Sequence, residues 1–301
     1  MKRWELIAVA CLTVAGCAPK PSQEIQPQLF DGQRAYRHVE RLVGYGPRPA
    51  GSLALGMTAT YISSQLQEFG LTVEEQVFRS ATPRGGKQFR NIIGKTPGRG
   101  GPGQVIILGS HYDTKDFDQF PFVGANDGGS STGVLLEMAR VAGSQPNLWF
   151  VFFDGEEAMV EYGPNDGLWG SRFFVEQLKG DRRTDWIQAF ILLDMVGDAR
   201  LNVTVPRNST PALAQAVFDA ARALGYRDQF GYHTGDVTDD HVPFLEAGIP
   251  AVDLIDFQYG SAPGLNDYWH TPQDTLDKIR PRSLEIVGRT TLKLIAQLRS
   301  R

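Results

Sequence analysis

Acidic and imidazole side chains repeatedly follow the apolar segments of this sequence. His111 and Asp113 come directly after one apolar segment, Glu156 follows a second, and Asp194 ends a third. If these segments are parallel strands, their carboxyl ends meet at one edge of a sheet, where such folds bind ligands. The sequence therefore predicts a polar site at that edge. Its candidate members are His111, Asp113, Asp127, Asp154, Glu156, Glu157, Asp194, Asp239, Asp240, His241 and His270.

Neutral imidazole and carboxylate oxygens form a ligand set that suits zinc, and a catalytic zinc keeps three protein ligands and one open position. The chain has two cysteines, Cys11 and Cys17, both close to the N-terminus, so a structural zinc site built from thiolates is excluded. Glu156 and Glu157 are adjacent and point in different directions where they leave a strand. One carboxylate can then bind metal while the other transfers protons.

Each of these features also has an ordinary structural interpretation. A histidine at a strand end is often structural, a Glu-Glu pair often lies in a solvated turn, and Asp-Gly alone marks a turn. The placement of the whole set after several predicted strands favours a common site. By contrast, His38 on an early amphipathic helix and His233 in a glycine-rich stretch are predicted to be structural or exposed.

The segments that position these residues alternate between strand and helix patterns. This alternation predicts an α/β fold with a mixed, mainly parallel central sheet flanked by helices on both faces. A helical region, interrupted by glycine and proline, covers residues 31–70. Strands are predicted at 71–78, 89–94, 105–110, 148–153, 190–194 and 251–255, and further helices at 131–142, 168–178, 211–224 and 281–298.

Residues 1–17 have the pattern of an export signal. Lys2 and Arg3 supply positive charge, and the apolar run at residues 6–14 is too short to span a bilayer. Small residues then directly precede Cys17, which resembles the bacterial lipobox and implies that Cys17 is lipidated. The alternative is a signal peptide without lipidation.

These features predict three parts of the chain. Residues 1–17 are a lipoprotein signal peptide, residues 18–30 are a flexible tether rich in Pro, Gln and Ser, and residues 31–301 are one catalytic domain. Ala18, rather than Asp, follows Cys17, which favours the outer membrane, facing the periplasm. We expect the lipid to be the only membrane contact.

The overall composition excludes one class of function. Charged residues make up 21% of the chain and the formal net charge is -4, without a basic patch large enough for nucleic acid. No nucleic-acid partner is therefore expected. We expect a monomer.

Several motifs resemble those of the M28 family of zinc peptidases, which has a zinc aminopeptidase fold, and within it the glutaminyl-peptide cyclotransferases. The resemblance covers nearly all of the chain after residue 45. An extended loop between Glu157 and Gly170, ending in Asp166-Gly167-Leu168-Trp169, is similar to the cyclotransferase loop. The other matching segments are residues 46–52, 91–94, 110–113, 124–127, 154–158, 192–194, 239–244 and 269–271.

The resemblance implies a ligand set for the metal. Asp127, Glu157 and His270 match the zinc ligands of the cyclotransferases. His111 and Asp194 match positions that hold a second zinc in the aminopeptidases. We therefore expect one zinc ion, with two as the alternative.

The resemblance also implies roles in catalysis and substrate binding. Glu156 matches the proton-transfer residue, and Asp239 and Asp194 are the further catalytic candidates. Trp269 matches a residue near the substrate. Tyr162 stands where animal cyclotransferases have a tryptophan, which keeps an aromatic wall but departs from the family pattern.

The function implied is that of a zinc-dependent glutaminyl-peptide cyclotransferase, an acyltransferase that converts the N-terminal glutamine of peptides to pyroglutamate and releases ammonia. The alternative is an M28 aminopeptidase that hydrolyses N-terminal residues. A minor alternative is an inactive envelope binding protein, although every matched ligand and Glu156 are present. The long loop and the Trp269–His270 pair favour the cyclotransferase.

Overall fold

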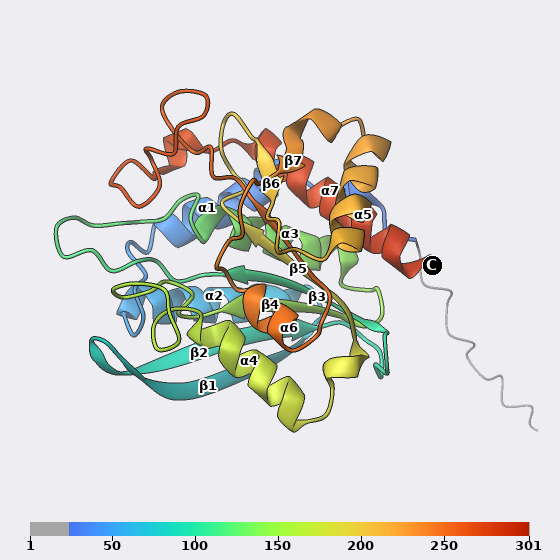
Figure 1. Cartoon of the computed structure of the whole chain (residues 1–301), viewed down its shortest axis with the longest axis horizontal. Helices are drawn as coiled ribbons and strands as arrows, with labels where there is room; N and C mark the ends of the chain where they lie inside the picture. The colour runs from blue at the N-terminus through green and yellow to red at the C-terminus, as the bar shows by residue number, and fades with distance from the viewer. Residues whose placement is uncertain (1–23, 301) are drawn as a thin grey trace, which may run out of the picture.

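The computed structural model describes residues 24–300, and these residues contain one eight-stranded mixed sheet. The strand order is β1-β2-β4-β3-β5-β8-β6-β7 (Figure 1). β4, β3, β5 and β8 are parallel neighbours, whereas β1 and β2 form an antiparallel hairpin at one edge. The strands are β1 (Thr72–Thr82), β2 (Gly85–Lys95), β3 (Val105–His111), β4 (Leu148–Phe153), β5 (Ile187–Asp194), β6 (Val203–Val205), β7 (Phe230–Tyr232) and β8 (Ala251–Ile255).

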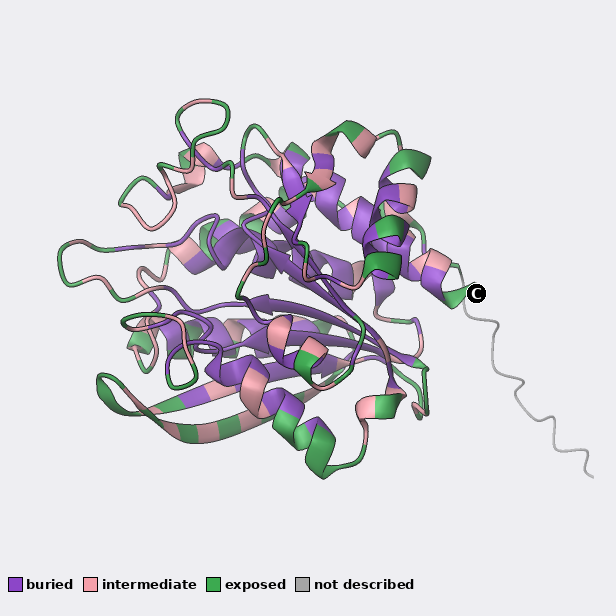
Figure 2. Ribbon diagram, viewed as in Figure 1, coloured by how far each residue is buried: buried purple, intermediate pink, exposed green. Residues whose placement is uncertain are grey.

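Helices cover both faces of this sheet, as predicted. One hydrophobic core joins α1, α2, α3, α5 and α7 to one face, and a second core joins α4 and α6 to the other. The central strands between the two helical layers are buried, whereas β1 at the edge of the sheet is exposed or half-buried along its length (Figure 2). The helices are α1 (Gly32–Val43), α2 (Leu53–Glu68), α3 (Gly129–Ala142), α4 (Trp169–Gly180), α5 (Pro211–Ala223), α6 (Val242–Glu246) and α7 (Pro281–Arg299).

Local sequence explains the main elements. Every residue of β3 and β4 is buried, as expected for parallel strands that are covered on both faces. The side chain of Asp31 caps α1 by accepting hydrogen bonds from two backbone amides, and Ser52 caps α2 in the same way with one. Pro211 and Pro281 lie in the first turns of α5 and α7, where a missing N–H costs nothing.

Three short elements were absent from the sequence prediction. β6 and β7 have three residues each and α6 has five, which is too short for a hydrophobic period to be recognised. None of these three elements changes the fold class. β6 and β7 extend the sheet beyond β8, and α6 follows the Asp239-Asp240-His241 segment of the predicted site.

The predicted signal peptide and the first part of the predicted tether lie outside the described residues. Within the described part, Ile25 and Phe30 are buried in the hydrophobic core. The packed body therefore begins before residue 31, where the sequence placed its start. No helix among residues 24–300 is long and apolar enough to cross a membrane.

Arg48 is fully buried and holds together the segments that lead into the predicted site. Its guanidinium donates hydrogen bonds to the backbone carbonyls of Tyr112 at 3.1 Å, Val123 at 2.7 Å and Gly124 at 3.1 Å. Its backbone N–H donates to Thr114 Oγ1 at 2.9 Å. This single side chain thereby connects the end of β3 to the glycine-rich loop before α3.

We expect Arg48→Met to lower the free energy of unfolding by about 3–5 kcal/mol, because several buried carbonyls would lose their donor. Urea denaturation monitored by circular dichroism measures this change. Arg34→Met is the control, since the Arg34 side chain is 53% exposed and its ion pair with Asp31 is 3.9 Å long. An equal, small effect for both variants would contradict this role of Arg48.

Candidate active site

Three predicted zinc ligands lie together at the carboxyl edge of the sheet. His270 Nε2 lies 3.3 Å from Asp127 Oδ2 and 3.3 Å from Glu157 Oε1. Asp127 comes from the loop before α3, Glu157 from the segment after β4, and His270 from the segment between β8 and α7. One ligand atom from each residue lies within 4.8 Å of the others, so the three side chains can surround one cation.

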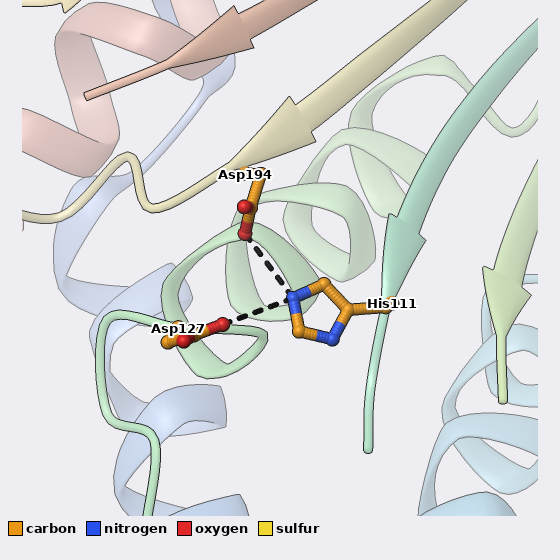
Figure 3. A group of neighbouring side chains, drawn as sticks. All are labelled: His111, Asp127 and Asp194. Atoms are coloured by element: carbon orange, nitrogen blue, oxygen red, sulfur yellow. Dashed lines mark hydrogen bonds and ion pairs between the residues drawn. The ribbon is translucent and has the colours of Figure 1, made fainter. Parts of the chain in front are cut away.

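The residues predicted for a second metal form a neighbouring group that shares Asp127. His111 Nε2 lies 3.2 Å from Asp127 Oδ1 and 3.2 Å from Asp194 Oδ1 (Figure 3). His111 ends β3 and Asp194 ends β5. His111 approaches Oδ1 of Asp127, whereas His270 approaches Oδ2 of the same carboxylate. Asp127 is therefore the residue on which both groups depend.

The electrostatics of the two groups suit a bound cation. Although burial lowers the pKa of His270, the carboxylates of Glu157 and Asp127 raise it to about 10. Asp127 is itself buried, which raises its pKa, but hydrogen bonds from His111 and His270 hold that pKa below its ordinary value. The buried carboxylates are thus stabilised by protonated imidazoles next to them. A zinc ion can supply the same positive charge in place of those protons. The donor set is the imidazole and carboxylate set typical of zinc.

Asp113, predicted as a member of the polar site, orients the glutamate pair. Its two carboxylate oxygens accept hydrogen bonds from the backbone N–H groups of Glu156 at 3.2 Å and Glu157 at 3.3 Å. His111 Nδ1 lies 3.5 Å from Asp113 Oδ1, an ion-pair distance without a hydrogen bond. Asp113 therefore fixes the backbone from which both reactive carboxylates project.

Asp274 supports Asp127, a candidate metal ligand, from the other side. It accepts hydrogen bonds from the backbone N–H groups of Asn126 at 2.7 Å and Asp127 at 3.1 Å, and from the hydroxyl of Tyr259 at 2.7 Å. Burial, followed by the charge of Asp127, raises the pKa of Asp274 to about 7. The segment after His270 thus returns to hold the loop that carries Asp127.

A cavity of about 390 Å³ opens beside these groups. Eight of the predicted site residues line it, namely Asp127, Glu156, Glu157, Tyr162, Asp194, Asp239, Trp269 and His270. His111 contacts the lining residues Asp127 and Asp194 without lining the cavity itself, and Asp113, Asp154, Asp240 and His241 do not line it either. Cys17 lies outside the described residues. The sequence did not predict residues 236–238, which line the cavity. It also placed His233 outside the site, which is wrong because His233 lines the cavity. The lining residues are Asp127, Glu156, Glu157, Tyr162, Asp194, His233, Asp236, Val237, Thr238, Asp239, Ile255, Phe257, Trp269 and His270.

Aromatic rings form one wall of the cavity and pack against the imidazole of His270. Trp269 stacks on His270 with ring centroids 4.0 Å apart and packs edge-on against Phe257 at 5.8 Å. Phe117 and Phe122 contact His270 edge-on from outside the cavity, at 5.6 and 5.8 Å. His270 has a positive φ of 56°, a conformation that this packing must hold against its steric cost.

Tyr162 reaches the site from the long loop after the glutamate pair. Its hydroxyl donates to Glu156 Oε2 at 3.1 Å and lies 3.4 Å from Glu157 Oε2. The predicted aromatic wall is therefore also a polar contact, which the sequence comparison with tryptophan did not indicate. His38, by contrast, is a buried residue of α1 that hydrogen-bonds Tyr61 at 2.6 Å, so its predicted structural role is confirmed.

Asp239 joins the cavity to a buried cluster behind it. Asp239, His241 and Asp253 place one ligand atom each within 4.8 Å of one another, and all three are buried. His241 Nδ1 lies 3.9 Å from Asp253 Oδ2, a looser approach than in the two groups at Asp127. Burial, then the charges of Asp253, Asp194 and Glu156, raise the pKa of Asp239 well above its ordinary value.

The ligand groups, the glutamate pair and the sheet together match a known family. Residues 91–295 match peptidase family M28. The chain belongs to this family. The M28 match begins in β2 and ends in α7, so it includes every segment that contributes to the cavity.

Named relatives and solved structures refine the similarity. A glutaminyl-peptide cyclotransferase of Gloydius blomhoffii is 30% identical over 274 residues, covering 77% of this chain and 72% of its own length. The crystal structure of a glutaminyl cyclase from an Acidobacteriales bacterium aligns with a TM-score of 0.85 and 35% identity, covering 95% of this chain and 100% of that one. A Zn-dependent exopeptidase from Parabacteroides distasonis aligns with a TM-score of 0.78 and 30% identity, covering 88% of this chain and 98% of that one.

We expect Asp127→Asn to abolish zinc binding at both groups, because Asp127 contributes an oxygen to each. Equilibrium dialysis followed by elemental analysis should give about one zinc ion per wild-type chain, held by Asp127, Glu157 and His270, with the fourth coordination position open. His270→Ala should also lose this ion, whereas His111→Ala should keep it. Asp198→Asn is the control, since Asp198 is equally buried but outside the cavity. Undiminished zinc in Asp127→Asn would contradict the assignment.

Proposed function

We propose that this chain is a zinc-dependent glutaminyl-peptide cyclotransferase with a single zinc ion held by Asp127, Glu157 and His270. The observation that carries the proposal is the position of Glu156, which lines the cavity beside these ligands without belonging to either metal-binding group. A free carboxylate at this place can transfer protons to and from a bound substrate. The similarity to glutaminyl cyclases over nearly the whole chain supports the same conclusion.

The residues of the cavity fit the steps of cyclisation. When bound, zinc supplies a Lewis acid that polarises the side-chain amide carbonyl of an N-terminal glutamine. The α-amine of that glutamine forms the new C–N bond, and the bond from the same carbon to the amide nitrogen breaks. Glu156 accepts a proton from the attacking amine and gives it to the departing nitrogen, which leaves as ammonia. No external reactant is required.

The surroundings of Glu156 suit this proton transfer. Burial chiefly, with the charges of Glu157 and Asp240, raises the pKa of the Glu156 carboxyl well above its ordinary value. A carboxyl with a raised pKa can both take up and return a proton near neutral pH. Asp239 lines the same cavity, and burial, followed by the charges of Asp253, Asp194 and Glu156, raises its pKa well above the ordinary value too.

The aromatic wall suits a reaction that must exclude water. Trp269 and Phe257 present apolar surface beside the metal ligands, and Tyr162 stands near the glutamate pair. Packed rings hold a small side chain in one orientation, which brings the amine close to the amide carbon. The cavity of one chain already holds the three proposed zinc ligands, Glu156 and the aromatic wall, so we propose that the protein acts as a monomer on peptide or protein N-termini.

A second candidate is an M28 aminopeptidase, favoured by the group of His111, Asp127 and Asp194, which can hold a second zinc ion. In that reaction Glu156 would take a proton from water, which would attack the first peptide bond. The similarity to a Zn-dependent exopeptidase is consistent with it. Cyclisation is preferred because Trp269 and Tyr162 of the long loop, the features that resemble the cyclotransferases, both line the cavity.

Mass spectrometry of a Gln-initiated peptide, incubated with zinc-loaded protein lacking the first 17 residues, tests the proposal. We expect a loss of about 17 mass units, the mass of ammonia, and a decrease of at least about 100-fold in kcat for Glu156→Gln, because the proton acceptor is removed. Glu161→Gln, at an exposed position of the same loop, is the matched control. Release of a free first residue from Gln- or Leu-initiated peptides would establish the aminopeptidase instead.

We also propose that the protein is a lipoprotein of the outer membrane that faces the periplasm, joined to its lipid through Cys17. Small residues before Cys17 and the following Ala18 support this. Cys17→Ser should abolish incorporation of labelled palmitate and move the protein from the membrane to the soluble envelope fraction. Labelling of the Cys17→Ser variant at the wild-type level would refute lipidation at this residue.

A further inference from the structure

The hydroxyl of Tyr162 lies between the two glutamates, and its position is more specific than an aromatic wall requires. It donates to Glu156 Oε2 at 3.1 Å, with Glu157 Oε2 at 3.4 Å. The other oxygen of Glu156, Oε1, accepts no hydrogen bond from the part of the chain that the structure describes. Tyr162 therefore occupies one oxygen of the proton-transfer residue and leaves the other for the substrate.

The loop that carries Tyr162 is built to hold it in place. The carboxylate of Asp166, which is 6% exposed, accepts hydrogen bonds from the backbone N–H groups of Met159 at 2.8 Å, Val160 at 2.7 Å and Glu161 at 3.0 Å. Arg172 of α4 donates to the carbonyls of Gly163 and Pro164, each at 2.8 Å. Hydrogen bonds to the residues just before and just after Tyr162 thus hold the loop in place.

The residues around the Tyr162 ring also restrict its position. Gly167 has a φ of 76°, and a Cβ at this position would lie 2.7 Å from Tyr162 Cδ1, so only glycine permits this approach of the ring. Lys115 Nζ lies 5.6 Å from the centre of the ring and donates to the carbonyl of Ala158 at 2.6 Å. The base of the loop closes on the backbone of Glu156, whose carbonyl accepts from Leu168 N–H at 2.9 Å.

We propose that Tyr162 is a positioning residue for proton transfer. Its hydroxyl holds the carboxylate of Glu156 in one orientation, so that Oε1 faces the amine of the substrate. The inference rests on the proposed function for the identity of that substrate. The phenol O–H is the donor in this contact, and the carboxylate oxygen is the acceptor. A tryptophan ring at this position would supply a wall, but not this hydroxyl.

Tyr162→Phe removes the hydroxyl and keeps the ring. In the full chain, purified in detergent and loaded with zinc, we expect kcat to fall about tenfold while KM stays within about twofold, because orientation of the acceptor is lost and the wall remains. Zinc content, measured by elemental analysis, should equal that of the wild type. Tyr61→Phe is the matched control, since it loses a hydroxyl that bonds His38 at 2.6 Å and should leave kcat unchanged.

Asp166→Asn tests the loop without touching the cavity, which Asp166 does not line. A weaker acceptor for three backbone amides should loosen the loop and lower kcat about threefold, again with unchanged zinc content. Because Asp166→Asn is expected to act through the Tyr162 hydroxyl, it should add little when Tyr162→Phe has already removed that hydroxyl. Full additivity of the two effects would overturn the proposed path through the loop.

Three results for Tyr162→Phe would overturn the inference: an unchanged kcat, a raised KM with unchanged kcat, or loss of zinc. The second would make Tyr162 a wall alone, and the third would make its hydroxyl a support for Glu157. Failure of the proposed function is seen separately, in the wild type. If the wild type hydrolyses Leu-initiated peptides instead, the same ratio of variant to wild type is measured for hydrolysis, since Glu156 transfers the proton there too.

Discussion

Burial of several carboxylates at one edge of the sheet is the constraint on which the rest of this structure depends. Asp127, Glu156, Glu157, Asp194 and Asp239 share one cavity, yet none is more than 8% exposed. Charges in such a place must be paired or neutralised. The imidazoles of the two ligand groups and a metal ion meet part of this requirement, and the raised pKa of Glu156 and Asp239 meets another part by favouring protonation. The same groups thereby acquire the properties that proton transfer needs.

Other carboxylates in the structure serve geometry rather than chemistry. Asp113 binds the amides of the glutamate pair, Asp274 binds those of Asn126 and Asp127, and Asp166 binds three amides of the long loop. Each of these aspartates accepts hydrogen bonds from the backbone amides of a loop and so holds that loop in one conformation. Fixed loops hold the ligands and Glu156 in place before substrate arrives, so little reorganisation is required during the reaction. The positions of the side chains in the site therefore depend on Asp113, Asp274 and Asp166.

The sequence predicted the main strands and the residues that follow them, because buried parallel strands are apolar along their whole length and end abruptly in polar residues. It did not predict β6, β7 or the place of His233, because a three-residue strand has no period and a loop position depends on distant contacts. For Tyr162 the resemblance to the family indicated an aromatic ring in the site but not the hydrogen bond of its hydroxyl. That contact depends on the turn at Gly167 and on Asp166, neither of which reveals its partner in the sequence.

The charge pattern of the site does not by itself select one reaction of the family. Two ligand groups sharing Asp127, with Glu156 beside them, suit attack by water as well as attack by an amine. The selection must come from what occupies the space beside Glu156 when the bond forms. Trp269, which stacks on His270, and Tyr162, which donates to Glu156, both line that space. An amine that belongs to the bound glutamine is already inside the cavity, whereas water must be bound separately, so proximity favours cyclisation over hydrolysis.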